Sequence, residues 1–247
     1  MNKRKVLILL TAVSVALASA ATELANPMRA AAESVKGTAK ISGASYFGEL
    51  KNGLPHGKGK LEWSSSKWYM GEFVQGKRSG TGKYLNQYID SSGKMHRIVY
   101  NGEWKNDRMN GSGVQTEDVS NENGQLYLKK FITGTFANNT WVSGYNVGHV
   151  LGDPDYSYLY KGNGITLWIW DTNLPLMERW KNGSLFRVQY QKGSVYRDYS
   201  MFTEESTTKE KARLEALRYL QSVTSQVEPH LKKFQELAKQ VPIEVQF

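Results

Sequence analysis

Cysteine is absent from this chain of 247 residues. Its absence excludes a disulfide framework, zinc held by thiolates, an iron–sulfur cluster and a thiol nucleophile. Histidine is scarce, and His56, His96, His149 and His230 lack the i, i+4 spacing with glutamate that a zinc protease presents. We therefore expect neither a resident metal nor a cofactor.

One apolar run near the N-terminus is too short for a membrane-spanning helix. Val6 to Ala18 holds 13 mainly apolar residues, whereas a spanning helix needs about 20. The run follows a basic segment at residues 3–5 and ends at Ala18-Ser19-Ala20, the small-x-small pattern of a signal-peptidase site. Residues 1–20 are therefore predicted to be a signal peptide, with cleavage as late as residue 32 left open. The protein is expected to be exported, either secreted or associated with the cell surface.

Basic residues outnumber acidic ones by 32 to 23, which gives a formal net charge of +9. Removal of residues 1–20 would leave 29 basic residues against 23 acidic ones. An exported basic protein meets anionic lipid head groups, wall polymers or acidic proteins rather than nucleic acid. We therefore expect no nucleic-acid partner.

A short segment recurs along the chain with the same order of residues. It begins at Tyr46, returns 23 positions later at Tyr69 and a further 31 positions later at Tyr100. A degenerate fourth copy covers 132–136, and 180–183 is a still weaker candidate. The repeat-defining residues are a tyrosine, a glutamate and several glycines in each copy: Tyr46, Gly48, Glu49, Gly53, Gly57, Gly59, Tyr69, Gly71, Glu72, Gly76, Gly80, Gly82, Tyr100, Gly102, Glu103, Gly111 and Gly113.

Each copy is predicted to be a β-hairpin, because two stretches of alternating residues flank a glycine-rich connection. Tyr46 and Gly48 lie on one face, and the charged residues lie on the other. A glycine inside a strand leaves the backbone bare, which predicts that an aromatic ring from a neighbouring hairpin packs there. One hairpin cannot bury such a face, so the hairpins are expected to stack into one elongated sheet.

These residues resemble the MORN (membrane occupation and recognition nexus) repeat family, whose pattern is Tyr-x-Gly-Glu-aromatic followed by Gly and Gly-x-Gly. Residues 46–61 and 69–84 match at nearly every position, and 100–114 departs where Asp107 replaces a glycine. The match extends weakly to about residue 144. The resemblance implies stacked hairpins and attachment to membranes or to protein partners.

The expected fold class is mainly β, an elongated antiparallel sheet of stacked β-hairpins with a C-terminal α-helical cap. A linker at 21–43 precedes the repeat array at 44–144, and a β-meander continues over 145–202. Residues 203–242 are expected to form an amphipathic helix that is kinked or broken at Pro229. Its apolar stripe either caps the sheet or forms a dimerising coiled coil, so the oligomeric state stays open.

Extra residues between the copies predict two hairpins that project beyond the edge of the first two repeats. One is expected to turn at 90–93, and the other at Asn123-Gly124, a strong turn sequence. Ser-x-x-Lys spacings at Ser64 and Ser91 fall in predicted turns and do not open a helix, as a penicillin-recognising site requires. The recurring glutamates are expected to be solvated or paired with lysine. We therefore expect no enzyme.

The leading hypothesis is a non-enzymatic exported binding or scaffold protein at the cell envelope, which docks on an anionic membrane or on a protein partner. Residues 46–113 hold eleven basic residues against six acidic ones. The alternative hypothesis is a carbohydrate-binding module for cell-wall glycans that uses the aromatic residues of 141–199, Trp168, Trp170 and Trp180 among them. The candidate residues for an anionic surface are Lys51, Lys58, Lys60, Lys77, Arg78, Lys83, Lys105 and Arg108.

Overall fold

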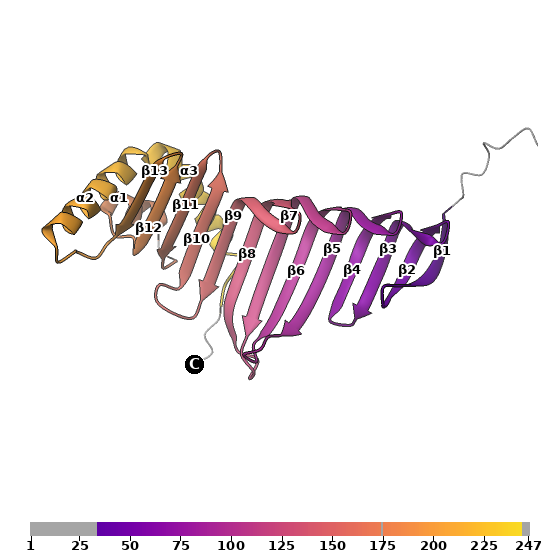
Figure 1. Ribbon diagram of the computed structural model, residues 1–247. Helices are drawn as coiled ribbons and strands as arrows, with labels where there is room; N and C mark the ends of the chain where they lie inside the picture. The colour runs from indigo at the N-terminus through magenta and orange to yellow at the C-terminus, as the bar shows by residue number, and fades with distance from the viewer. Residues whose placement is uncertain (1–33, 174, 244–247) are drawn as a thin grey trace, which may run out of the picture.

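The computed structural model describes residues 34–173 and 175–243 as one antiparallel sheet of 13 strands with three helices. Each strand pairs with the next along the chain, so that β1 lies at one end of an elongated sheet and β13 at the other (Figure 1). The expected fold class, a mainly β sheet of stacked hairpins with a helical C-terminal part, is confirmed. The predicted signal peptide lies outside the described residues.

The repeats and the extended hairpins occupy nine strands, and the C-terminal part adds four strands and the helices. The first nine strands are β1 (Val35–Ile41), β2 (Ala44–Lys51), β3 (Leu54–Ser64), β4 (Lys67–Val74), β5 (Lys77–Ile89), β6 (Met95–Lys105), β7 (Arg108–Ser120), β8 (Leu126–Ala137) and β9 (Thr140–Val150). The remaining elements are β10 (Tyr156–Gly162), β11 (Ile165–Asp171), α1 (Leu176–Asn182), β12 (Arg187–Lys192), β13 (Val195–Ser200), α2 (Thr207–Ser222) and α3 (Thr224–Ala238).

Tight two-residue turns set the register of the hairpins. Asn52 and Gly53 both have positive φ, at 53° and 75°, which is the backbone of a type I′ turn. Asn106 and Asp107 repeat the arrangement at 50° and 68°. Asparagine, aspartate and glycine tolerate this conformation better than other residues, which explains their recurrence at the turns.

The expected linker is partly a strand. Residues 35–41 form β1, which pairs with β2 along its whole length and places Gly37 opposite Gly48. Ala39 and Ile41 pack against the core of the first repeats. The prediction of a linker is therefore wrong for this segment, because β1 covers the edge of β2 that would otherwise stay open.

The two projecting hairpins form where the sequence predicts them. β5 and β6 remain paired out to Ile89 and Met95, and β7 and β8 out to Ser120 and Leu126. The Asp90 carboxylate accepts hydrogen bonds from the backbone N–H groups of Ser92 (2.8 Å) and Lys94 (3.0 Å), which closes the first turn.

The sheet continues through 145–202, but a helix interrupts the expected meander. The weak repeat candidate at 180–183 is wrong, since Trp180 lies in α1 and Gly183 ends that helix with φ 67°. Trp180 is buried, and its indole N–H donates to the Thr224 hydroxyl at 3.0 Å. Helix α1 therefore packs against α3 at the C-terminal end of the sheet.

The C-terminal helix breaks at Val223 rather than at Pro229. Val223 separates α2 from α3, and Pro229 lies within α3. A proline there removes only the bond to the carbonyl group of Ser225, and both residues are exposed, so water can hydrate that carbonyl group.

The apolar stripe of the helices is buried against the sheet, as the capping interpretation requires. Helix α3 covers the face of the sheet that carries Tyr145, Tyr158 and Tyr160, where Phe234 contacts the Tyr158 ring at 5.4 Å between centroids. Figure 1 shows the three helices gathered at the β10–β13 end. A coiled coil through this stripe is therefore excluded. The buried residues of the stripe are Leu220, Val227, Leu231, Phe234 and Val241.

Candidate functional site

Each repeat is built around a tyrosine that lies over a glycine. The ring of Tyr46 in β2 occupies the space that a Cβ at Gly59 in β3 would need. The Tyr46 hydroxyl donates to the carbonyl oxygen of Glu49 at 2.7 Å. Burial is the main cause that raises the pKa of Tyr46 to about 12, so the hydroxyl remains protonated. The same contacts recur for Tyr69 over Gly82 and for Tyr100 over Gly113.

The ring thus comes from the same hairpin, and the prediction of a ring from a neighbouring hairpin is wrong. Gly59 lies opposite Gly48, two residues beyond Tyr46, so the phenol reaches it by leaning along its own strand. The contact between hairpins is made by the aromatic residue after the glutamate. The ring of Phe73 meets the edges of Tyr46 and Tyr69, with centroids at 5.1 and 5.2 Å.

Two of the three repeated glutamates accept hydrogen bonds from backbone N–H groups, and Glu72 accepts from the Thr81 hydroxyl at 3.0 Å. Glu49 accepts from the N–H of Lys58 at 3.0 Å, and Glu103 accepts from the N–H of Ser112 at 2.8 Å. The strand register shifts immediately after Gly48 and Gly102, where these carboxylates fill the irregularity. Within the described residues none of these glutamates forms an ion pair with lysine, so that part of the expectation is wrong. Glu103 remains exposed to solvent, as expected, while its carboxylate accepts from an N–H group at the bulge that needs an acceptor.

The two-residue turns of the repeats form one continuous edge, here named the turn edge and consisting of residues 51–54, 74–77 and 105–108. Backbone hydrogen bonds join successive turns, from the N–H of Gly76 to the carbonyl of Pro55 at 2.9 Å and from Asp107 to Arg78 at 3.0 Å. Because a hairpin contributes two strands, successive turns lie about 10 Å apart. The edge is therefore a fixed row of side chains.

Four of the eight basic residues that are candidates for binding an anionic surface lie on the turn edge. Two aliphatic side chains, Leu54 and Val74, lie among them with 50% and 49% of their surface exposed. The Asp107 carboxylate of the same edge is paired with Arg78. The exposed cations of the turn edge are Lys51, Lys77, Lys105 and Arg108.

Three further candidates, Lys58, Lys60 and Lys83, lie on the face opposite the repeat tyrosines. They line a groove of about 670 Å³ whose floor is the backbone of the paired glycines. Phe47 and Met70 form its walls, exposed by 64% and 54%. Lys60 is paired with Glu62 at 2.5 Å. The groove is thus separate from the turn edge and less positively charged.

Arg78, the eighth candidate, is not part of a surface site. Its side chain is only 17% exposed, and its guanidinium lies 4.5 Å from the centre of the Trp104 ring. It donates to Asp107 at 3.1 Å from Nε. Arg78 is therefore enclosed between repeats, which corrects its assignment to an anionic surface.

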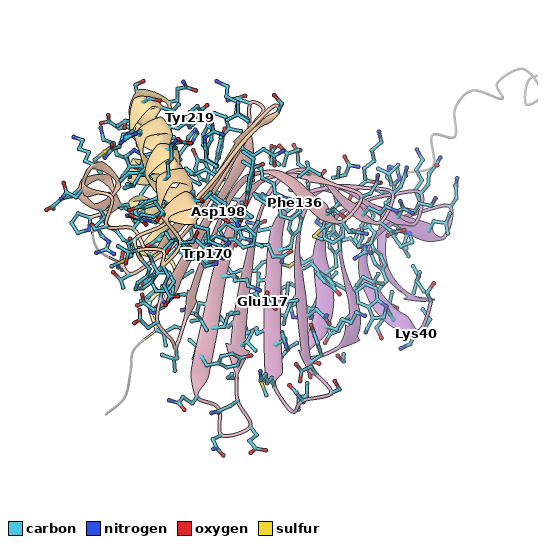
Figure 2. The ribbon with its side chains drawn as sticks, turned by 60° about the vertical axis from the view of Figure 1, so that its left-hand side comes forward. Lys40, Glu117, Phe136, Trp170, Asp198 and Tyr219 are labelled. Carbon is cyan, nitrogen blue, oxygen red and sulfur yellow. The ribbon has the colours of Figure 1, made fainter. Side chains whose placement is uncertain are left out.

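Most aromatic residues of 141–199 are buried in the core beneath the helices, and Trp180 is among them. Trp168 and Trp170 in β11 are among the exceptions: they alternate with the buried Ile169 and lie on the opposite face of the sheet, as does Tyr196 in β13, which is 51% exposed. Trp168 is 37% exposed. Figure 2 shows Trp170 and Asp198 on this part of the sheet, apart from Tyr219 on α2. The structure thus narrows the aromatic candidates on this face to Trp168, Trp170 and Tyr196.

The structure also assembles a charged cluster that the sequence did not indicate. His96 in β6 lies between Asp90 and Glu117, with Nε2–Oδ2 and Nδ1–Oε1 distances of 3.1 and 3.0 Å. Lys130 binds the second oxygen of Glu117 at 3.2 Å. The register of the projecting hairpins, which the sequence predicts only roughly, creates this proximity. Among the described residues, no group of three His, Asp or Glu side chains is arranged to hold a metal ion.

The fold and its repeated unit define the class of protein: a single-sheet array of β-hairpins with exposed edges and faces for binding. A sequence model of the MORN repeat matches residues 46–67, 69–86 and 100–116, so the chain carries MORN repeats. Within residues 34–173 and 175–243, no helix has the length and apolar character needed to span a bilayer.

The similarity to curated proteins covers the repeats. MORN repeat-containing protein 3 of Xenopus laevis is 42% identical over 75 residues, which are 30% of this chain and 31% of that protein. Human alsin is 36% identical over 75 residues, which are 30% of this chain and 4% of alsin. The chain thus spans less than a third of the length of these relatives. The MORN repeats suggest a binding or scaffold role.

Proposed function

We propose that this protein is a non-enzymatic, exported binding module that docks on an anionic membrane surface through its turn edge. The MORN repeats support the binding role in general. The predicted signal sequence at 1–20 supports export, and N-terminal sequencing of the secreted product tests it. A product that begins between residues 21 and 33 is expected. Retention of the whole chain inside the cell would contradict export.

The observation that carries membrane docking is the composition of the turn edge. Within the described residues, none of its four cations lies within ion-pair distance of a carboxylate. Each cation near an anionic surface contributes about 1 kcal/mol, so four give roughly 4 kcal/mol and a dissociation constant of about 1 mM. Burial of Leu54 and Val74 would strengthen this docking.

Vesicle co-sedimentation tests the proposal, with residues 21–247 as the protein and phosphatidylserine mixed with phosphatidylcholine as the membrane. Pelleting is expected with these vesicles and not with phosphatidylcholine alone, and it should weaken as salt screens the charges. The variant K51Q/K77Q/K105Q/R108Q should lose it.

A matched control removes the same charges from the helical part. The variant K181Q/K209Q/K211Q/R218Q changes three lysines and one arginine, all exposed, and should pellet as the unmodified chain does. If both variants lose pelleting equally, the net charge of the protein and not the turn edge causes its binding to the vesicles. No pelleting in any condition would exclude membrane docking.

A second candidate function, glycan binding, is favoured by the exposure of Trp168. Aromatic side chains with a few polar groups beside them are the usual lining of small-molecule and sugar sites. This function does not involve the turn edge, so the two candidates are tested separately.

A further inference from the structure

We infer that the exposed face of β11–β13 binds a pyranose ring of a neutral polysaccharide against Trp168. This inference rests on the second candidate function, glycan binding, and is independent of the turn edge. The site is here named the tryptophan platform and consists of Thr166, Trp168, Trp170, Arg187, Gln189, Gln191, Tyr196 and Asp198.

The platform continues a face that the repeats bury. Strand pairing from β2 to β11 places Trp168 in the same cross-strand row as Tyr46, Tyr69 and Tyr100. Those tyrosines are at most 1% exposed, because rings such as Phe73 pack against them. Trp168 retains 37% exposure in the same row. This cross-strand row is therefore open to solvent at the β11 end of the sheet.

The tryptophans are held in a defined stack. The rings of Trp168 and Trp170 lie 4.3 Å apart between centroids and 24° from parallel. The guanidinium carbon of Arg187 lies 5.7 Å from the centre of the Trp170 ring. Trp170 thus has Trp168 and its cross-strand partner Arg187 as neighbours. Because Trp168 stacks on Trp170, two residues further along β11, its other ring face lies on the side of Thr166, two residues before it.

Neutral polar groups lie next to that outer face. The register places Gln189 opposite Trp168, Gln191 opposite Thr166, and Tyr196 opposite Gln191. Amide and hydroxyl groups both donate and accept hydrogen bonds, as the hydroxyls of a sugar do. The flat C–H face of a pyranose would meet the electron-rich face of Trp168, while its hydroxyls would reach the amides.

The charged groups of the platform are already paired with each other. Asp198 accepts from Nε and Nη2 of Arg187 at 3.0 and 2.7 Å, and from Nε2 of Gln189 at 3.1 Å. The Tyr196 hydroxyl donates to the same carboxylate at 3.3 Å. This pairing fixes the polar side chains and leaves no unpaired charge on the platform for an anionic head group. A neutral polysaccharide therefore fits the platform better than an anionic lipid does.

The test uses residues 21–247 with cellohexaose and chitohexaose as soluble probes in calorimetric titrations, and with cellulose and chitin in pull-downs. At least one probe should bind, and Trp168→Ala should weaken binding by about tenfold or more. Trp168→Tyr, which keeps an aromatic face, should recover most of the affinity. Phe47→Ala is the control, since it removes from the repeats an aromatic side chain that is even more exposed than Trp168, at 64% against 37%.

If Trp168→Ala fails to fold, the double variant Q189A/Q191A tests the inference instead. It should weaken glycan binding at least about threefold. The inference is overturned if none of the probes binds, or if Trp168→Ala binds as the unmodified chain does. Sedimentation velocity measures the oligomeric state of the unmodified chain and of the Trp168→Ala variant. If the substitution converts a dimer into a monomer, the platform is a contact between two copies of the chain and the inference fails. The K51Q/K77Q/K105Q/R108Q variant should bind the glycan normally, so failure of membrane docking leaves the platform unaffected.

Discussion

Arg78 and Asp107 join two consecutive repeats by hydrogen bonds to both the side chain and the backbone. The Arg78 N–H and Nε both donate to Oδ1 of Asp107, at 3.0 and 3.1 Å, and Nη2 donates to its carbonyl oxygen at 2.8 Å. Asp107 occupies the turn position that is glycine in the first two repeats, with φ 68°. The departure from the repeat pattern thus links two repeats, at the cost of some backbone strain.

A double-mutant cycle should measure this link. Arg78→Met and Asp107→Asn keep the bulk of each side chain and remove its charge. We expect a coupling free energy of about 1 kcal/mol in urea unfolding, moderated because Asp107 is 46% exposed. A cycle on the exposed pair Lys233 and Glu236 serves as the control and should give less than about 0.5 kcal/mol. Equal coupling in both cycles would contradict the link.

Gly59→Ala should destabilise the first repeat by about 1–3 kcal/mol, because the added Cβ overlaps the ring of Tyr46. Gly152→Ala is the matched control: a Cβ there meets no atom within 4 Å, so its effect should be within about 0.5 kcal/mol. Thermal and urea unfolding of the two variants provide the measurement. Similar stability for both would show that the tyrosine does not require the glycine.

The pKa values of His96 and His230 should be shifted in opposite directions from the ordinary value of 6.5. Partial burial lowers the pKa of His96, but the hydrogen bonds with Glu117 and Asp90 outweigh it, so the pKa is raised above 6.5. Its contribution to stability is complete below pH 6.5 and is lost as pH rises through the folded pKa. Burial against Tyr160 lowers the pKa of His230. Its contribution is therefore present above pH 6.5 and is lost as pH falls towards the folded pKa.

Proton NMR of the imidazole C–H signals should give the two midpoints. The His96 midpoint should lie above 6.5 and the His230 midpoint below it. His96→Gln should remove the loss of stability on the alkaline side and leave the His230 titration unchanged. Coincident midpoints near 6.5 would mean that neither environment acts on its imidazole.

Arg179→Met should destabilise the C-terminal part by about 3–5 kcal/mol. The Asp171 carboxylate is fully buried and accepts from Nε and Nη2 of Arg179 at 2.6 and 2.7 Å, so loss of the arginine leaves a buried charge without its partner. Arg97→Met breaks the more exposed pair with Asp118 and should cost less than about 1 kcal/mol. Chemical unfolding compares them, and similar losses would contradict the buried pair.

The repeat pattern predicted local geometry well and contacts between hairpins poorly. Period-two alternation identified the face that carries Tyr46 and Gly48, because side-chain direction along a strand depends only on sequence position. The partner of the glutamate at position 49 escaped prediction, since its acceptor role depends on a bulge in the paired strand. Arg78 was misplaced for a similar reason: its enclosure depends on Trp104, which is 26 positions further along the chain.

The sequence by itself determined that the chain forms stacked hairpins, where their turns lie, and that an apolar helical stripe follows them. These features follow from periodicity and turn chemistry, which act over a few residues. Only the tertiary structure decided which cations line the turn edge, which are enclosed, and that Trp168 is exposed while Trp180 is buried. Such distinctions depend on which strands pair and on which face the helices cover, and these are contacts between residues far apart in the chain.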